Sequence, residues 1–482
     1  MKTLEIRKSL RKLISGDVLW DKDILNFYSV DSSLYQVTPK VVVIPATEED
    51  VISVVKFAKK NKISVTVRGA GTGLVGSALN TGIIIDLKNL NSITVKKNYS
   101  IIGAGIIKGK LDQVLSQKGK FFPPNPSIGP YCAMGGIIGN NASGARTLKY
   151  GSTIDNLEEI TFVNGKGEKI TLPTNNKISK NVFKISSKIE KEKFPMVSKN
   201  SCGYRLDCIK SIKDTHKILA GSEGTLGIVL SAKIRIRDIP KRRLLVIVEY
   251  QSLRNAAKDC LKIKETNPSA IEFVDKSTLK NFDFKFKKNT DCLLFVEYDS
   301  DIEKNKNNLK NFADGQIAKI SKSRKEIEKW WKFRDLALSY SLKSIKQEDR
   351  IPHIIEDATV PLEKLGNLFS IIEKLNKKFH TNTVMYGHAG NGNIHVRIIS
   401  NRKKIKILDE ISRTYFEQII ELGGTITGEH GDGIARSRFI KNQYGPTNYQ
   451  LFKKIKEFFD PEEILNPGKI TKPRRFSTLE KV

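Results

Sequence analysis

Two histidines and a glutamate in the C-terminal part of the chain have the side-chain types of a divalent metal site. His388 and His395 lie in the Gly-rich segment 387–395, and Glu429 lies in a second Gly-rich segment, 427–431. Two imidazoles and a carboxylate suit zinc, manganese or iron(II), with coordination positions left open for a substrate. The alternative is a pair of hydrogen-bonded core histidines, although these two short segments hold three of the six histidines in the chain.

Short strands are the elements expected to position these residues. Residues 383–386 form a strand-like segment, and residues 394–399 alternate as a second strand. The Gly-rich turn between them would let His388, at one strand end, approach His395, at the start of the next. Residues 425–427 are a further strand-like segment that leads to Glu429.

The composition is that of a globular protein with two or three domains. The chain has 482 residues and a hydrophobic content of 39%. No apolar run approaches the roughly 18 residues of a membrane span. Residues 1–14 lack the apolar core of a signal peptide and instead predict a short amphipathic helix. We expect a cytoplasmic protein, and peripheral contact with the inner face of the membrane stays open.

Charge and cysteine content argue against a nucleic-acid-binding protein and against a protein held together by disulfides or by an iron–sulfur cluster. The formal net charge is +31, but the lysines are spread along the chain without a nucleic-acid recognition motif or a basic tail. A general bias toward Lys, Ile and Asn explains this charge, so we expect no nucleic-acid partner. The five cysteines are scattered and include no Cys-x-x-Cys, which argues against a disulfide framework and against an iron–sulfur cluster in this chain.

Three Gly-dense blocks earlier in the chain predict a cradle for a phosphate-bearing cofactor. They are residues 69–76, 122–144 and 220–229. The first contains Gly71-Thr-Gly73-Leu-Val-Gly76, which matches the dinucleotide fingerprint G-x-G-x-x-G. However, only six residues separate Gly76 from the next strand, which is too few for the helix of a Rossmann unit. We still expect the backbone N–H groups of residues 69–76 to converge on a pyrophosphate. Ordinary tight turns are the alternative.

The order and spacing of these motifs resemble one family over nearly the whole chain. The matching segments are 68–73, 135–144, 221–229, 387–395, 428–431 and 465–468. Together they are similar to the FAD-linked D-2-hydroxyacid dehydrogenases of the vanillyl-alcohol oxidase superfamily. That family includes D-lactate dehydrogenase, the flavin subunit of glycolate oxidase and D-2-hydroxyglutarate dehydrogenase.

The resemblance implies an α+β protein with a two-lobed FAD-binding domain, an α+β cap domain and a C-terminal tail that returns to the FAD domain. We expect an N-terminal helical segment at 1–37, the FAD domain at 38–240 (lobes of about 38–178 and 179–240), the cap at 241–455 and the tail at 456–482. FAD is expected to be non-covalent, because residues 68–73 contain no histidine. The implied FAD contacts are Arg68, Gly69, Ala70, Gly71, Thr72, Gly73, Ser77, Ser127, Gly135, Gly136, Gly139, Asn141, Ser143, Glu223, Gly227, Ile228 and Asn466.

The resemblance also assigns roles in the cap domain. It places a divalent metal, with zinc favoured, on His388, His395 and Glu429, and a catalytic base on His430. A histidine suits the removal of the hydroxyl proton, because its pKa lies near neutrality. Arg334, in Trp331-Lys-Phe-Arg334, is the implied clamp for the substrate carboxylate. A helix-surface salt bridge of Arg334 is the alternative.

Two further residues are expected near the substrate, and two others depart from one family pattern. Arg397 and Asn393 are additional candidates for substrate contact, although Arg397 would also fit a solvent-facing position. Leu338 and Ile355 occupy places where we associate Thr and Lys with 2-hydroxyglutarate specificity. The chain is therefore expected to act on a smaller or different 2-hydroxyacid.

The leading hypothesis is FAD-dependent oxidation of a D-2-hydroxyacid, D-lactate or glycolate, to the 2-oxoacid. Electrons would pass to a quinone, a cytochrome, an electron-transfer flavoprotein or an iron–sulfur subunit, and a homodimer or hetero-oligomer is expected. One alternative is a flavin oxidase of another alcohol or an aldonolactone, which needs no metal. The alternative from a different class is a basic, non-enzymatic binding protein.

Overall fold

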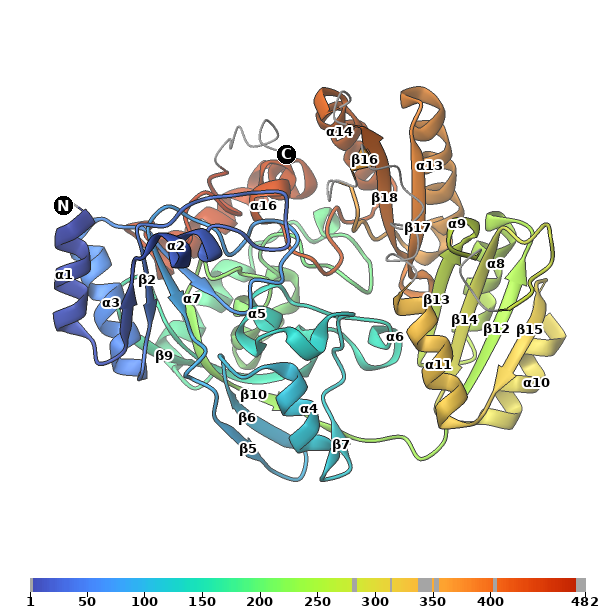
Figure 1. Ribbon diagram of the computed structural model, residues 1–482, viewed down its shortest axis with the longest axis horizontal. Coiled ribbons are helices and arrows are strands. Elements are labelled where there is room, and N and C mark those ends of the chain that lie inside the picture. Colours follow the sequence, from blue (N-terminus) through green and yellow to red (C-terminus); the bar gives the residue numbers. More distant parts are fainter. Residues whose placement is uncertain are drawn as a thin grey trace.

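The computed structural model describes residues 3–279, 284–312, 314–336, 349–350, 355–401 and 405–473. Two bodies make up the fold (Figure 1). The first holds the N-terminal half of the chain and the last long helix, and the second is built around one seven-stranded sheet. Helices and sheets both occur in each body, so the expected α+β class is confirmed.

The first body begins with a four-stranded sheet in the order β1-β2-β4-β3. β2 and β3 are both parallel to β4, and β1 is antiparallel to β2. The Thr47 side chain caps α3 by accepting a hydrogen bond from the Asp50 N–H, as the acidic start of that helix predicts. The strands are β1 (Asp17–Leu19), β2 (Val41–Ile44), β3 (Val65–Arg68) and β4 (Ile83–Asp86), and the helices are α1 (Thr3–Leu13), α2 (Lys22–Tyr28) and α3 (Glu48–Asn61).

A five-stranded antiparallel sheet, in the order β5-β6-β10-β8-β9, completes the strand framework of the first body. Its strands are β5 (Ile93–Val95), β6 (Tyr99–Gly103), β8 (Leu157–Val163), β9 (Lys169–Leu172) and β10 (Ile228–Arg235). β7 (Lys120–Phe121) pairs with β11 (Arg237–Asp238) as a separate ribbon. The helices are α4 (Lys108–Ser116), α5 (Met134–Gly139), α6 (Thr147–Tyr150) and α7 (Asn176–Ser186).

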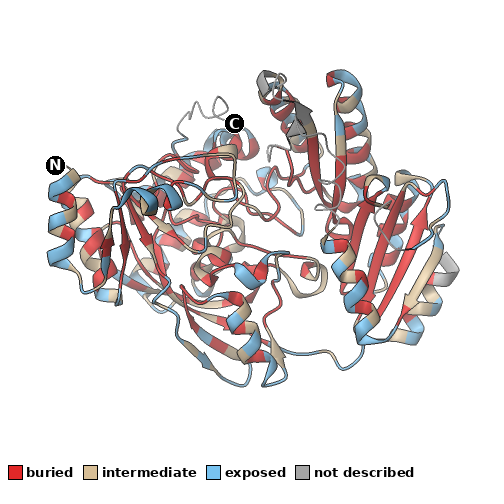
Figure 2. Cartoon of the chain, viewed as in Figure 1, coloured by how far each residue is buried: buried red, intermediate tan, exposed pale blue. Residues whose placement is uncertain are grey.

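The second body is a mixed helix–sheet domain whose strand order is β15-β12-β14-β13-β17-β18-β16. Its central strands are buried on both faces (Figure 2). Alternate residues of β12 belong to two different cores, because Leu244 and Val246 pack with α8 whereas Leu245 and Ile247 pack with α11. The strands are β12 (Leu244–Tyr250), β13 (Ala270–Asp275), β14 (Cys292–Tyr298), β15 (Gln316–Ser321), β16 (Asp349–Arg350), β17 (Asn382–His388) and β18 (Asn393–Asn401). The helices are α8 (Leu253–Lys264), α9 (Lys276–Leu279), α10 (Ile302–Phe312), α11 (Arg324–Asp335), α13 (Leu365–Phe379) and α14 (Ile405–Glu421).

The chain then returns to the first body. α15 (Gly433–Arg436) and α16 (Ile440–Phe459) follow the cap, and α16 packs against α7. Tyr444, in α16, donates a hydrogen bond to the Cys202 carbonyl at 2.6 Å. The range 241–455 expected for the cap therefore includes a helix that packs on the first body. Beyond it, Leu465 bridges to Val65 of β3, so the end of the described chain lies on the first body.

Charged side chains join the two bodies beside α6. Arg146 donates two hydrogen bonds to Glu297 of β14, at 2.7 and 2.9 Å. The indole of Trp331, in α11, donates to the same carboxylate at 2.7 Å. Lys149 pairs with Asp299 at 2.5 Å. Because Arg146 and Glu297 are largely buried, this bidentate pair fixes the relative position of α6 and the cap sheet.

Three sequence expectations can be compared with the structure at this point. Residues 425–427 do not form a strand, because only Thr425 makes an isolated bridge, to Thr359. Leu338 lies outside the described residues, whereas Ile355 is described and buried. Between β3 and β4 the chain forms a loop without a helix, which agrees with the rejection of a Rossmann unit. Among the described helices, none is long and apolar enough to cross a membrane.

Candidate active site

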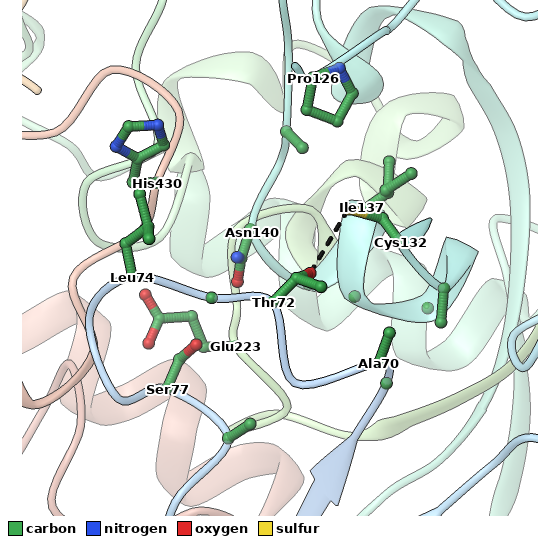
Figure 3. A pocket seen from close by; sticks show the side chains of 18 of the residues that line it. Ala70, Thr72, Leu74, Ser77, Pro126, Cys132, Ile137, Asn140, Glu223 and His430 are labelled. Carbon is green, nitrogen blue, oxygen red and sulfur yellow. Dashed lines mark hydrogen bonds between the residues drawn. The ribbon is translucent and has the colours of Figure 1, made fainter. Parts of the chain in front are cut away.

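One continuous cavity connects the Gly-dense blocks of the first body with the histidine segments of the second. Most of its wall comes from the loop after β3, from α5 with the residues before it, and from the turn before β10. Its other end is lined by Tyr386, His395, Arg397, Glu429 and His430. Figure 3 shows His430 on one side of this space and Ala70, Cys132 and Ile137 on the other.

Fourteen of the seventeen residues proposed to contact FAD line this cavity. They are Arg68, Gly69, Ala70, Gly71, Thr72, Gly73, Ser77, Ser127, Gly135, Gly136, Gly139, Ser143, Glu223 and Gly227. The other three do not line the cavity. Two of them, Asn141 and Asn466, instead form hydrogen bonds with the backbone of segments in or next to its wall. Asn141 donates to the Asn200 carbonyl at 3.2 Å, and Asn466 donates to the carbonyls of Ser77 and Glu223 at 2.8 and 2.7 Å. Ile228 is buried in β10.

The cavity has the backbone exposure that a flat, phosphate-bearing cofactor needs. A Cβ atom added at Gly136 would meet no atom within 4 Å, so this glycine of α5 faces open space. Gly71 has a φ of +71°, a conformation that L side chains rarely adopt. The Thr72 hydroxyl and the Cys132 thiol are hydrogen-bonded at 3.4 Å and tie the loop to the wall opposite (Figure 3). These residues fit a bound FAD.

Strand pairing places the predicted metal ligands next to one another. β17 and β18 are antiparallel, with Tyr386 opposite His395 and His388 opposite Asn393. Because alternate residues of a strand share a face, Tyr386 and His388 lie on the same side as His395 and Arg397. The His388 and His395 ring centroids are 5.2 Å apart.

Both imidazoles direct Nε2 toward one oxygen of Glu429. Glu429 Oε1 lies 3.0 Å from His388 Nε2 and 3.2 Å from His395 Nε2. The Nδ1 atoms of His388 and His395 have acceptors of their own, Glu272 Oε1 at 2.7 Å and the Glu356 carbonyl at 3.2 Å. Each Nδ1 therefore carries a hydrogen, as in histidines that bind a metal through Nε2. In the neutral rings, Nε2 of each histidine carries a lone pair that a cation beside Glu429 Oε1 could accept, so this donor set fits a metal.

Burial and neighbouring charges set the ionisation of these ligands. Burial alone would raise the pKa of Glu429, but Lys199 and His388 outweigh it and hold that pKa well below its usual range. Burial lowers the pKa of His395 to about 4, so this imidazole is neutral at physiological pH. A carboxylate and a neutral imidazole are the forms that coordinate a divalent ion.

A second combination of side chains in the same place could also hold an ion. Asp357, His395, Glu429 and His430 have potential ligand atoms within 4.8 Å of one another. Asp357, however, already accepts three backbone hydrogen bonds at Oδ2, from Gly428, Glu429 and His430, at 2.8–3.0 Å. Its carboxylate therefore shapes the loop that carries Glu429. We favour the set with His388, whose Nε2 has no such competing role.

His430 lies beside this cluster and is paired with a buried carboxylate. Its Nδ1 is 2.7 Å from Glu356 Oε2, and its ring stacks on that of His395 at 5.0 Å. Burial opposes a charge on His430, but Asp357 and Glu356 raise its pKa to about 9. Glu356 is itself buried, yet His430, Arg397 and Arg436 hold its pKa well below its usual range. The pair resembles a histidine oriented by a carboxylate for proton transfer.

The two candidate arginines occupy different positions. Arg397 lines the cavity, with Nε 3.3 Å from the Tyr386 hydroxyl and Nη2 3.6 Å from Glu356 Oε2. Arg334 is buried and pairs with Glu272, which also accepts from His388. The expected alternative, a surface salt bridge, is limited to a 3.5 Å contact with Asp335. The Arg334 Nε has no hydrogen-bond partner among the described residues.

Asn393 does not line the cavity. Its amide nitrogen donates to the Ala358 carbonyl at 3.1 Å and lies 3.3 Å from Asp357 Oδ1. It therefore braces the segment that carries Glu356 and Asp357.

Sequence reasoning did not single out several buried polar residues around the site. Tyr386 could have been found from its spacing, because it precedes His388 by two residues in the same strand. Glu272, Glu356 and Lys199 carry no comparable local signal, since each meets the site across a long stretch of chain. Arg436 belongs to the same group and pairs with Glu356.

Two family descriptions match the two parts of the chain. Residues 39–173 match an FAD binding domain, and residues 239–470 match the C-terminal domain of FAD linked oxidases. Among solved structures, an alkyldihydroxyacetonephosphate synthase covers 97% of this chain and is itself covered to 85%, with a TM-score of 0.69 and 17% sequence identity. That likeness supports the fold.

Curated relatives align over nearly the whole chain. The glycolate oxidase subunit GlcD of Bacillus subtilis is 28% identical, over 92% of this chain and 91% of that protein. The D-lactate dehydrogenase of Anaerostipes hadrus is 28% identical, over 90% and 89%. The D-2-hydroxyglutarate dehydrogenase of Haemophilus influenzae is 28% identical over 92% of this chain, which spans only 49% of that relative. The chain therefore carries an FAD binding domain followed by the C-terminal domain of FAD linked oxidases, the two domains of the family that its motifs resemble.

Proposed function

We propose that this protein oxidises a D-2-hydroxyacid, with D-lactate or glycolate favoured, to the corresponding 2-oxoacid. The observation that carries this proposal is the single cavity that joins the glycine-lined cradle to His395, Arg397, Glu429 and His430. A hydroxyacid bound among these four side chains would lie next to a cofactor held in the cradle. The names of the relatives, which include a glycolate oxidase subunit and a D-lactate dehydrogenase, support the same substrate class.

The FAD is proposed to be non-covalent, because residues 68–73 offer no histidine for attachment. A bound FAD would supply the acceptor for the hydride that leaves the α-carbon of the substrate. The chain itself supplies the cradle: Gly136 leaves room for the cofactor, and Asn466 fixes Ser77 and Glu223 in the wall from behind.

A divalent metal, with zinc favoured and manganese or iron possible by chemistry, is proposed to bind to His388, His395 and Glu429. When bound, it would lower the pKa of the substrate hydroxyl. The chain presents Nε2 of both histidines and Oε1 of Glu429 at one point, and Glu272 and the Glu356 carbonyl fix the two rings. This arrangement supports the proposal because it gives each histidine the tautomer that a metal requires.

His430 is proposed to accept the hydroxyl proton at Nε2. Its Nδ1 is engaged with Glu356, which leaves Nε2 as the nitrogen available to a ligand in the cavity. With a pKa of about 9, His430 is mostly protonated at neutral pH, so its minor neutral form would accept the proton, and the carboxylates that raise the pKa would stabilise the imidazolium that forms. A positioned base of this kind contributes roughly 10²–10⁴-fold to rate.

The substrate carboxylate is proposed to bind at arginine. Arg397 lines the cavity within reach of a ligand between the histidines, and we assign it direct contact. Arg334 does not line the cavity but pairs with Glu272. Its Nε has no hydrogen-bond partner among the described residues, so Arg334 could make a second contact with the substrate carboxylate if its ion pair with Glu272 rearranged. Asn393 is assigned an indirect role through the segment that holds Glu356.

The electron acceptor is proposed to be a quinone, a cytochrome, an electron-transfer flavoprotein or an iron–sulfur subunit. The chain offers no Cys-x-x-Cys, so an iron–sulfur relay would belong to another chain. D-2-Hydroxyglutarate is a less favoured substrate because of Leu338 and Ile355, which replace the expected polar residues.

The test is anaerobic reduction of the purified yellow protein by D- and L-2-hydroxyacids and by glycolate. Rapid loss of the flavin absorbance with one D-acid or with glycolate is the expected result. If no acid bleaches the flavin, even after the protein has been supplied with zinc, manganese and iron(II), the hydroxyacid assignment is wrong. A colourless protein that binds anionic surfaces would instead favour a non-enzymatic role.

A further inference from the structure

The carboxylate of Glu429 divides its two oxygens between two sets of partners. Oε1 faces Nε2 of His388 and of His395, at 3.0 and 3.2 Å. Oε2 accepts hydrogen bonds from Lys199 Nζ at 2.9 Å and from Ser143 Oγ at 2.6 Å. Two donors on Oε2 leave Oε1 as the oxygen directed at the two imidazoles.

Lys199 is held rigidly in this position. Its side chain is fully buried, and Nζ also lies 3.5 Å from the Asn393 amide oxygen. The following residues run along the Glu429 loop: the Ser201 N–H donates to the Thr427 carbonyl at 2.9 Å, and the Gly203 N–H donates to Asp432 at 2.7 Å. Because an ammonium group buried without a carboxylate is strongly unfavourable, Lys199 stays on Glu429 as long as this segment is folded.

We propose that Lys199 and Ser143 are positioning residues that restrict Glu429 to one-oxygen coordination of the metal. This inference rests on the metal centre of the proposed function. Three protein ligands, each giving one atom, leave open positions on the ion for the hydroxyl and carboxylate of a hydroxyacid. If Oε2 also coordinated, it would occupy one of those positions.

The two donors belong to the first body, whereas Glu429 follows the cap. Ser143 also lines the cofactor cavity, next to the wall that contains Gly139 and Asn140. The geometry of the metal ligand is therefore set from the side on which the cofactor binds. Removing either hydrogen bond to Oε2 should therefore change the coordination of the ion by Glu429 and leave the positions of the two histidines unchanged.

The experiment replaces the metal with cobalt(II) in the flavin-containing protein. Magnetic circular dichroism of cobalt(II), at wavelengths where oxidised flavin does not absorb, distinguishes four-, five- and six-coordinate ions. Lys199→Met and Ser143→Ala are compared with the wild type, and Lys108→Met serves as the control because it removes another buried lysine, one that pairs with Asp112. Oxalate, which is not oxidised, is then titrated as a two-oxygen ligand of the ion.

We expect both variants to show a higher coordination number than the wild type and to need roughly tenfold more oxalate for the same spectral change. Lys108→Met should match the wild type in both readouts. If Lys199→Met fails to fold, the conservative Ser143→Ala decides the question. Unchanged spectra in the folded variants would overturn this inference alone. A wild type that takes up no cobalt would overturn the metal centre as well, so the two failures are distinguishable.

Discussion

Glu356 Oε2 lies 2.7 Å from Nδ1 of His430, and this contact orients the imidazole whose other nitrogen is available to the cavity. Arg436 and Arg397 surround the same carboxylate, so Glu356 stays ionised in a buried position. The buried carboxylate and the cavity-facing imidazole together favour His430 as the proton acceptor.

Replacing His430 by Asn should leave a folded, yellow protein whose flavin is reduced about 10²–10⁴-fold more slowly by substrate. Asn keeps a polar side chain of similar length but cannot accept a proton. Single-turnover anaerobic kinetics measure the effect, and His380→Asn, at an exposed left-handed position far from the site, is the control. Undiminished reduction would remove His430 from the mechanism.

Replacing Arg397 by Met should raise KM more than it lowers kcat. A charge-assisted hydrogen bond contributes about 1.5–3 kcal/mol, which corresponds to roughly 10–150-fold in binding. Arg334→Met should affect metal content as well, because Arg334 pairs with the carboxylate that holds His388. Arg413→Met, on the exposed surface of α14, is the control for both. The assignment of Arg397 is wrong if KM is unchanged.

Replacing Gly136 by Val should give folded protein without bound flavin. The wild-type glycine faces open space in the cavity, so the added side chain would occupy volume that the cofactor needs. Flavin content after purification and the affinity for added FAD measure the loss. Gly366→Val in α13 tests for a general effect of a β-branched residue in a helix. Full flavin content in Gly136→Val would place the cofactor elsewhere.

Removing the metal with a chelator should abolish reduction by the hydroxyacid while the protein stays yellow. Reduction by dithionite should be unaffected, because it needs neither His430 nor the metal ligands. Adding zinc, manganese or iron(II) should restore activity, and His388→Ala should prevent that recovery. Full activity in a metal-free protein would contradict the role of His388, His395 and Glu429 and would favour a metal-independent alcohol oxidase.

The stability of the protein should fall with rising pH in a way that depends on Glu223. Burial and the neighbouring Asp432 raise the pKa of Glu223 to about 8. The folded state therefore keeps a proton that the unfolded state releases near pH ~4.3, and this contribution is fully present below that pH and lost as pH rises through 8. Glu223→Gln should lose less Tm than the wild type between pH 5.5 and pH 8.5. The exposed Glu457→Gln is the control, and parallel Tm profiles for all three proteins would contradict the assignment.

The parts of the site that the sequence predicted are those set by local geometry. The spacing of His388 and His395 across a Gly-rich turn predicts two paired strands, and β17 and β18 pair in that way. Away from the site, Thr47 and the acidic residues after it have the residue types of a capped helix start, and α3 begins there. Both depend on hydrogen bonds between residues close in the chain, for which residue type and periodicity carry enough information.

The parts that could not be predicted depend on contacts across the chain. Lys199 and Glu429 are 230 positions apart, and Glu272 and His388 are 116 positions apart. Nothing in the local sequence of Lys199 distinguishes it from the many other lysines of this basic protein. The strand expected at 425–427 fails for a related reason: the side chains and backbone of this segment bind Asn200, Thr359 and Gln443 instead of a neighbouring strand.

The return of the chain to the first body has a consequence for synthesis. Leu465 and Asn466 complete the β3 edge and the wall behind Ser77 and Glu223, yet they leave the ribosome only after the whole cap has been made. The cofactor cradle in the N-terminal half is therefore incomplete while residues 241–455 are translated. We therefore expect FAD to bind only after translation has passed the cap, and a nascent chain arrested at residue 240 to be colourless.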